Sequence, residues 1–439
     1  MIYLAITYDP IYWDTACLIV NSGSLDFSGG GASDYKKIAK AIGDIRNAGV
    51  QVSLVNINQS DFSFTPDVQN QRILFGLKGI LNVGEDVINS IIENRPYSSP
   101  RDFLNKAKPK RSSMISLIKS GAFDTMMDRK LCLGWYLWET CDKKNNLTLQ
   151  NLNGLISHHL LPENTDEQVM ARRIYEFTRY LKAVCFQKGN TYFTLDERAI
   201  NFLTEIDELR LIKNNNTLLV KDWDKVYQSW MDVYRNWIAQ NKNNILTKLN
   251  NEIFKEDWNK YAKKANLSAW EMEVLCFYYH EHELANVNKT KYGIIDFSRL
   301  SSTPTVAKTF QKNEHTINIY NLYKICGTCI AKDKTHSSIS LLTTEGVVEV
   351  KFSKTYFPMF DKQISRKNPD GTKTVIEKSW FTRGTMLVVQ GVRMGDSFMS
   401  KNYANSNSHQ LYKITSIDSD GDITLCSERA QGEVEDGED

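Results

Sequence analysis

The residues of this sequence with the clearest chemical potential form a tight turn, Asn82, Val83 and Gly84. Apolar residues lie at helical spacing on both sides of the turn, for example Leu77 before it and Val87 after it. Asn and Gly tolerate a positive φ, so they favour a sharp break between two helices. Backbone N–H groups at the start of the second helix would point outward, where they can bind phosphate without reading base sequence.

A second turn of the same kind is expected at Ser120 and Gly121, after apolar residues such as Met114 and Leu117. A basic run that includes Lys106, Lys108, Lys110 and Arg111 crowds the start of this second copy. We predict that both turns contact duplex phosphates through Lys78, Asn82, Val83, Gly84, Glu85, Lys110, Arg111, Lys119, Ser120, Gly121 and Ala122. The alternative is a pair of ordinary helical hairpins with a solvated basic loop, against which the tandem arrangement and the basic run argue.

This repeated pattern resembles the helix-hairpin-helix motif, a binder of the DNA backbone. The motif usually has Gly at both positions that flank the apolar residue of the turn. Here Asn82 replaces the first of them and Gly84 keeps the second.

Two other groups of side chains have spacings that suggest metal chemistry. Asp418, Asp420 and Asp422 alternate, but an Asp-Gly pair at their centre, between two strand-like runs, predicts a hairpin turn, and the downstream Glu of a calcium loop is absent. Cys326 and Cys329 form the only C-x-x-C. They lie in a strand-like run, where residues three apart face opposite sides, so we expect buried or half-buried thiols rather than zinc ligands.

The composition is that of an ordinary protein with several domains. The chain has 439 residues, of which 41% are hydrophobic and 24% charged, which allows two to four domains. The net charge of +2 means that any nucleic-acid surface must be local. The start lacks the features of a signal peptide, no apolar run reaches membrane-spanning length, and the 8 Cys are scattered. We therefore expect a cytoplasmic protein with free thiols and no membrane partner.

The hydrophobic period changes along the chain and predicts a multidomain α+β protein, mainly helical over its first two-thirds and then a β-barrel. Helical stretches are expected at 166–184, 222–240 and 244–264, in a region to which we assign no role. We predict six regions along the chain. They are an end-of-fingers-like region of mixed α and β structure (1–75), the tandem helix-hairpin-helix (76–127), a helical region (128–268), a connecting segment (269–315), the barrel (316–427) and a disordered acidic tail (428–439).

Five predicted strands and one short helix favour a barrel of the OB type, which binds single-stranded nucleic acid through a basic groove and aromatic platforms. The strands are expected at 323–331, 338–343, 347–352, 385–393 and 411–415, with the helix at 355–363. About half of the aromatic residues should instead fill the barrel. The candidates for binding a single strand are Tyr323, Lys351, Phe352, Lys354, Tyr356, Trp380 and Arg393.

Four segments in order resemble the C-terminal part of bacterial-type DNA polymerase III alpha subunits, the C family. The first runs from Tyr3 and Leu4 to Leu18, and the second, 37–60, has Leu54 and Val55 where the family has two prolines. The third is the most specific, 72–85 followed by 117–124, and the fourth is 273–284. The resemblance implies that the chain contains the end of the fingers, a tandem helix-hairpin-helix and an OB domain. It also implies a structural role for His282. Without the resemblance, His280 and His282 would suggest a pair of metal ligands.

The family transfers nucleotides with palm carboxylates that hold two Mg²⁺ ions. In the family, the palm motif lies N-terminal to everything matched here. The resemblance therefore implies that this chain has no catalytic residue and no cofactor. It implies instead that the Mg²⁺ ions are bound in the palm of a partner chain. We expect one part of a split replicative polymerase, as in a phage genome, although a fragment of a longer subunit fits equally well. The family also carries a short peptide that binds the sliding clamp. The segment of this chain most similar to it is 250–254, Asn250 to Phe254, which lacks the Gln of that peptide. The competing hypothesis is a non-enzymatic DNA-binding replication accessory protein.

Overall fold

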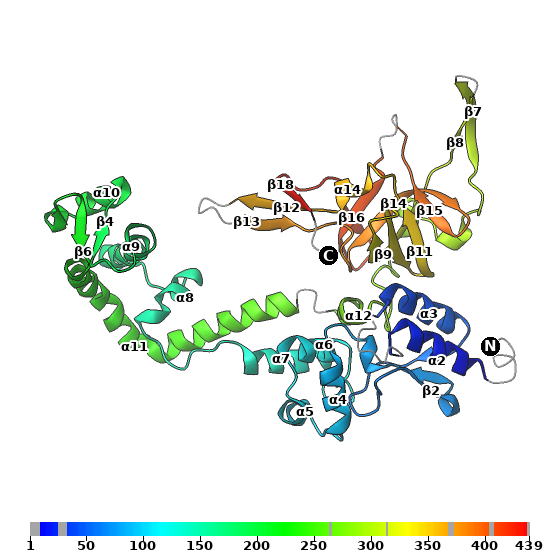
Figure 1. Cartoon of the computed structure of the whole chain (residues 1–439), viewed down its shortest axis with the longest axis horizontal. Coiled ribbons are helices and arrows are strands. Elements are labelled where there is room, and N and C mark those ends of the chain that lie inside the picture. Colours follow the sequence, from blue (N-terminus) through cyan, green and yellow to red (C-terminus); the bar gives the residue numbers. More distant parts are fainter. Residues whose placement is uncertain are drawn as a thin grey trace. The chain divides into compact units, whose positions relative to one another are not determined.

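The computed structural model describes residues 9–24, 33–262, 266–312, 315–367, 373–403 and 408–436. The predictions made for Tyr3 and Leu4 and for the last three residues of the tail fall outside this part of the chain. The chain forms two compact units, which are described separately: unit 1 is Met1–Leu133 with Lys264–Asp439, and unit 2 is Gly134–Lys263 (Figure 1).

The N-terminal part of unit 1 packs two helices on a small sheet. Asp9 caps the first helix and Pro10 occupies its first position, which suits a residue without an N–H. Apolar residues of the second helix recur at Ile38, Ile42 and Ile45 and are buried. The bounds are α2 Pro10–Asn21, α3 Tyr35–Asn47, β1 Gln51–Val52, β2 Thr65–Asp67, η1 Val68–Asn70 and β3 Arg72–Leu74.

The next part consists of short helices joined by tight turns. The helix expected before Asn82 is only a single 3₁₀ turn, whereas the helix after it buries Val87, Ile88 and Ile91 as the spacing predicts. The elements are η2 Leu77–Gly79, α4 Glu85–Glu93, α5 Pro100–Ala107, α6 Arg111–Lys119 and α7 Arg129–Thr140.

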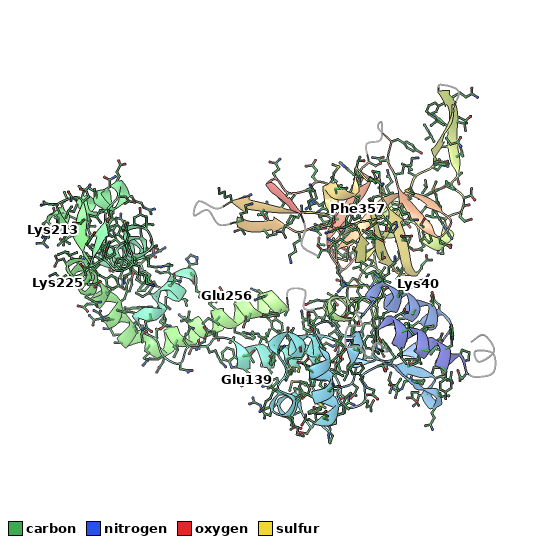
Figure 2. All side chains as sticks on the ribbon, viewed as in Figure 1. Lys40, Glu139, Lys213, Lys225, Glu256 and Phe357 are labelled. Atoms are coloured by element: carbon green, nitrogen blue, oxygen red, sulfur yellow. The ribbon has the colours of Figure 1, made fainter. Side chains whose placement is uncertain are left out.

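A closed five-stranded barrel forms the C-terminal part of unit 1. Its strands are β9 Tyr323–Asp333, β10 Ser338–Thr343, β11 Gly346–Lys351, β14 Met386–Met394 and β15 Ser397–Ser400. They pair in the ring β9-β10-β11-β15-β14-β9, with β11 and β15 parallel and the other neighbours antiparallel. A short helix, α14 Phe357–Phe360, follows the third strand, and its Phe357 packs in the barrel core (Figure 2). This arrangement is that of an OB-type fold, as predicted.

The segment 411–415 forms a strand as predicted, but it is not the fifth strand of the barrel. The segment 411–415 belongs to β16 Leu411–Ile417, which pairs with β14 outside the ring and carries β17 Ile423–Cys426 on its other edge. The true fifth strand, β15, has only 4 residues and follows β14 across a two-residue turn, so its short pattern merges with that of β14. The predicted helix at 355–363 is also shorter, because residues from Lys362 onward form a strand.

Two further β elements were not predicted. A hairpin of β7 Val306–Lys312 and β8 His315–Tyr320 precedes the barrel, and a sheet of β13 Lys373–Glu377, β12 Lys362–Lys367 and β18 Glu433–Asp436 accompanies it. Strand β18 belongs to the acidic tail that we expected to be disordered. It pairs antiparallel with β12, so this part of the tail is structured. The connecting segment contains α12 Leu267–Leu275, α13 Lys289–Tyr292 and η6 Phe297–Arg299.

Unit 2 is built around one long helix. The two helices expected at 222–240 and 244–264 are a single helix of 42 residues, because Asn241 to Asn244 contain no Gly or Pro and the helix continues through them. Trp223 and Tyr234 lie in its core, where the Trp223 indole N–H donates to Thr178 Oγ1 over 3.0 Å. The helices are η3 Leu149–Asn151, α8 Leu152–Ser157, α9 Asp166–Tyr180, a π-helical turn Leu181–Cys185, α10 Glu197–Glu205, η5 Leu209–Leu211 and α11 Val220–Tyr261, and the strands are β4 Tyr192–Thr194, β5 Ile212–Lys213 and β6 Thr217–Leu219.

Over the part of the chain that the structure describes, no helix has both the length and the apolar character needed to cross a bilayer.

Candidate nucleic-acid interface

The first predicted turn presents the start of α4 to solvent. Asn82 has φ +63°, the left-handed conformation that Asn tolerates, while Gly84 is extended with φ −78°. Asn82 and Gly84 are exposed and Val83 between them is buried. No side chain caps α4, so the N–H groups of its first turn lack the usual capping partner at an exposed helix end. The positive end of the helix dipole adds to their attraction for an anion.

The start of α6 lies beside this turn. The Ser113 hydroxyl donates to the carbonyl of Asn82 over 2.7 Å, and the Asn82 amide donates to Ser116 Oγ over 3.4 Å. Lys110 precedes α6 as its N-cap residue without a capping side chain. These contacts bring two uncapped helix N-termini together.

Basic side chains flank these two N-termini. Lys108 and Lys110 are exposed and Arg111 is half-buried at the first position of α6. Lys108 takes the left-handed conformation, φ +44°, which ends α5 and turns the chain into α6. We call Asn82, Gly84, Lys108, Lys110 and Arg111 the candidate phosphate surface. Lys108 was part of the basic run in the sequence but not among the predicted contacts.

Lys78 forms an ion pair across the first turn. Its Nζ lies 2.7 Å from Glu85 Oε1, and its side chain is 15% exposed. Glu85 is the first residue of α4, where a carboxylate interacts favourably with the helix dipole. The same carboxylate occupies the position that favours a phosphate, so it competes with an incoming anion.

The second predicted turn, at Ser120 to Ala122, faces the protein interior. The phosphate contacts expected there therefore do not fit the structure. Ser120, Gly121 and Ala122 are buried, and their N–H groups already donate to carbonyls within the turn over 2.9, 3.0 and 3.1 Å. Lys119 is 2% exposed, and its Nζ lies 2.6 Å from each carboxylate oxygen of Glu273. Neither the amides nor this lysine is open to a ligand.

A buried charge network explains why the second turn is covered. The Arg129 guanidinium donates to Asp124 Oδ2 over 2.5 Å and to Glu271 Oε1 over 3.1 Å. Burial opposes its charge, but the two carboxylates raise the pKa of Arg129 above its usual value. Glu271 also accepts from His280 Nδ1 over 2.6 Å. Sequence reasoning missed Arg129 and Glu271, since nothing in their spacing joins residues so far apart.

His282 has the structural role that the resemblance implied. Its Nε2 lies 3.1 Å from the carbonyl of Leu342 in β10, and its Nδ1 accepts from the N–H of Leu284 over 3.0 Å. Burial lowers the pKa of His282 to about 4, so the ring is neutral at pH 7. His280 and His282 thus serve different partners.

The other suspected metal ligands are also engaged elsewhere. Cys329 lies in the barrel core and Cys326 in a separate cluster, as the strand spacing predicted. Asp418 Oδ1 accepts from the N–H groups of Asp420 and Asp422 over 3.0 and 2.8 Å, and Asp422 pairs with Lys291. This hairpin turn between β16 and β17 does not fit a Mg²⁺ site. Among the described residues, no group of three or more His, Cys, Asp or Glu side chains is arranged to hold a metal ion.

Two of the barrel candidates are buried, and a third, Arg393, is half-buried and makes structural contacts. Trp380 is fully buried and its indole N–H donates to Glu377 Oε1 over 2.7 Å. Phe352 belongs to the barrel core. Arg393 donates to the carbonyl of Leu300 over 2.9 Å and covers the ring of Phe297 at 4.4 Å, so it fastens the connecting segment to the barrel.

The other four candidates retain some exposure. Lys354 is exposed, Lys351 is half-buried and 3.7 Å from Glu349, and Tyr323 and Tyr356 are half-buried. The Tyr356 ring packs against the barrel core, and this burial raises the pKa of Tyr356 to about 12.

The segment suggested as a clamp peptide lies within α11 of unit 2. The Asn250 side chain accepts from the N–H of Lys144 over 2.8 Å and donates to its carbonyl over 3.0 Å. The Phe254 ring packs against Trp138 with centroids 5.5 Å apart. These residues form part of a helical packing surface, which does not fit a free linear peptide.

Comparison with known proteins agrees with the motif and with the polymerase resemblance. The family model of the helix-hairpin-helix motif matches residues 49–131. The chain is 36% identical to a probable DNA polymerase, YorL, of Bacillus subtilis (strain 168), over 97% of this chain and 34% of that protein, with the same figures for a DNA-directed DNA polymerase of Bacillus phage SPbeta. It is 37% identical to the DNA polymerase III subunit alpha of Thermus aquaticus over 22% of this chain and 8% of that protein.

The chain is thus similar to parts of proteins named as DNA polymerases, among them DNA polymerase III alpha subunits, and its residues 49–131 match a helix-hairpin-helix motif. The chain spans about a third of the length of the first two relatives.

Proposed function

We propose that this chain is the C-terminal, DNA-binding part of a DNA polymerase III alpha-like replicative polymerase and that it grips primer–template duplex through backbone phosphates. The observation that carries the proposal is the meeting of two uncapped helix N-termini, held together by the 2.7 Å hydrogen bond from Ser113 to Asn82. Backbone amides and lysines bind phosphate irrespective of base sequence. A replicative enzyme needs such a grip because it must hold every sequence it copies.

The barrel would hold single-stranded template beside the duplex. Lys351, Lys354 and Tyr356 lie close together in sequence at the end of β11, and each keeps some exposure. A lysine and an aromatic ring are the groups with which OB barrels contact backbone and bases.

Nucleotide addition would depend on carboxylates and two Mg²⁺ ions in a palm, which we place in further polypeptide, either on a separate chain or on the same one. The described residues of this chain would act by positioning the primer–template. We assign no part of that chemistry to the turn at Asp418, Asp420 and Asp422, because Asp418 accepts from the N–H groups of the turn and Asp422 pairs with Lys291.

The direct test of the grip is to replace Gly84 with Asp and measure duplex affinity by fluorescence anisotropy. The new carboxylate would cap α4 and repel phosphate, so we expect binding to weaken by about tenfold or more, equally for unrelated DNA sequences. Gly84 has an ordinary φ of −78°, and an added Cβ would meet only the end of the Asp86 side chain, so the fold should tolerate the change. Gly84→Ala, which leaves the amides uncapped, is the matched control and should bind nearly as well as the wild type.

The polymerase assignment is tested by a tagged pull-down from the native source, mass spectrometry and primer extension. Recovery of a palm-bearing polypeptide together with primer extension by the eluate supports the proposal. Duplex binding without any such polypeptide would instead identify a non-enzymatic accessory protein.

A further inference from the structure

The β7–β8 hairpin projects from the barrel as a two-stranded ribbon (Figure 1). An isolated pair of strands is marginally stable in water, and such a ribbon is usually stabilised by what it packs against. Within the described part of the ribbon, Phe310 is 44% exposed and Ile317 is 37% exposed. These are large apolar groups to leave in solvent, which suggests that the ribbon has a binding partner.

The two faces of the ribbon differ in character. Phe310 and Ile317 are directly opposite each other, and Lys308 pairs with Ile319 two residues along on the same face. The other face is polar and uncharged, with Thr309 donating to Asn318 over 2.9 Å. Neither strand contains an Asp or Glu. One face therefore combines an exposed aromatic ring, aliphatic side chains and a lysine, and the two strands themselves carry no carboxylate.

The base of the ribbon is fixed beside one particular loop of the barrel. The N–H of Gly395, in the turn between β14 and β15, donates to the carbonyl of Ser302 just before β7 over 2.9 Å. The Tyr403 hydroxyl accepts from the N–H of Tyr320 at the end of β8 over 2.7 Å. Lys401 lies over the Tyr320 ring at 5.2 Å. In OB barrels the loop between the fourth and fifth strands borders the face that binds oligonucleotides.

We propose that the β7–β8 hairpin is a second single-stranded DNA-binding element, with Phe310 stacking on a base and Lys308 contacting the backbone. An aromatic platform beside a cation is the combination that binds single strands without sequence preference. The ribbon would extend the binding path of a single DNA strand that leaves the barrel past the β14–β15 loop. This inference rests on the proposed DNA-binding function and adds a site to it.

The test compares variants of the full chain for binding to a labelled oligothymidylate and to a duplex. Phe310→Ala and Lys308→Ala should each weaken single-strand binding, Phe310→Ala by about tenfold, and leave duplex affinity unchanged. Phe310→Tyr, which keeps a ring, should restore binding. Gln311→Ala changes an exposed residue on the polar face of the same strand and is the matched control.

A second readout locates the contact directly. Oligonucleotides carrying 5-iododeoxyuridine should cross-link to a peptide containing Phe310, as identified by mass spectrometry. Unchanged single-strand affinity in Phe310→Ala, or cross-links confined to the barrel, would overturn the hairpin site. Wild-type protein that binds duplex but not single strands would also overturn it, whereas failure to bind either DNA would reject the proposed function itself.

Discussion

At the residue scale, we expect the ion pair Lys78–Glu85 to set how strongly the first turn attracts an anion. The ammonium and carboxylate are 2.7 Å apart, and the carboxylate lies at the first position of α4. A phosphate that approaches the amides of α4 must displace or tolerate this negative charge. In the proposed site the backbone therefore favours phosphate, and the Glu85 carboxylate opposes it.

Replacing Glu85 with Gln should therefore strengthen duplex binding. The change removes a negative charge from the phosphate site and releases Lys78, and a charge at a helix end is worth enough to improve affinity by about two- to fivefold at low salt. Anisotropy titrations at several salt concentrations measure the effect. Glu93→Gln, an exposed change at the other end of α4, should have little influence, and an equal gain there would point to net charge rather than to this site.

At the scale of elements, His282 joins the connecting segment to the barrel. Its two ring nitrogens contact the N–H of Leu284 and the carbonyl of Leu342, so one side chain serves two elements. Arg129 and Glu271 similarly hold the second turn against the segment around His280. Buried polar contacts of this kind set which surfaces of the short helices remain open.

The neutral state of His282 predicts a loss of stability in mild acid. Its pKa is about 4 in the folded protein, below the usual 6.5, so between these values the unfolded chain binds more protons and stability falls as pH falls. The loss at pH 5 should be about 2 kcal/mol relative to pH 7. Urea unfolding at both pH values measures it. His282→Gln, which can still donate and accept but does not titrate, should lose most of this difference, and an unchanged difference would mean that other groups cause it.

At the scale of the whole molecule, the charge is nearly balanced and any attraction for DNA must be local. The net charge is only +2 at pH 7. The exposed lysines at the start of α6 lie next to two helix N-termini. Other exposed lysines lie on strands, such as Lys213 in β5 of unit 2 (Figure 2). Position, rather than total charge, is expected to decide which lysines contact phosphate.

The double change Lys108→Ala and Lys110→Ala tests this view through salt dependence. Each phosphate contact contributes about 0.9 to the slope of log K against log salt, so losing two should make the slope shallower by about 2. The pair Lys242→Ala and Lys248→Ala removes the same charge from exposed positions in the middle of α11 in unit 2 and should leave the slope unchanged. Equal effects of the two pairs would refute a localised surface.

The sequence by itself determined the local features whose causes are local. The sharp turn at Asn82, the helical face of Val87, Ile88 and Ile91, and the opposite facing of Cys326 and Cys329 follow from φ preferences and from the periods of helices and strands. These rules act over a few residues, so they can be recognised without a structure. The same rules indicated the OB-type barrel, although they misplaced its fifth strand.

The tertiary structure decided which of two similar turns is open. Both turns looked alike in sequence, yet the first is exposed and the second is covered, because Lys119 and Arg129 find carboxylates at Glu273 and Glu271 about 150 residues away in the chain. Burial of Trp380 and Phe352 depended likewise on which face of a closed barrel each ring meets. Whether such a side chain is buried or exposed depends on ion pairs and packing contacts with residues far away in the sequence. A local sequence pattern does not predict these contacts.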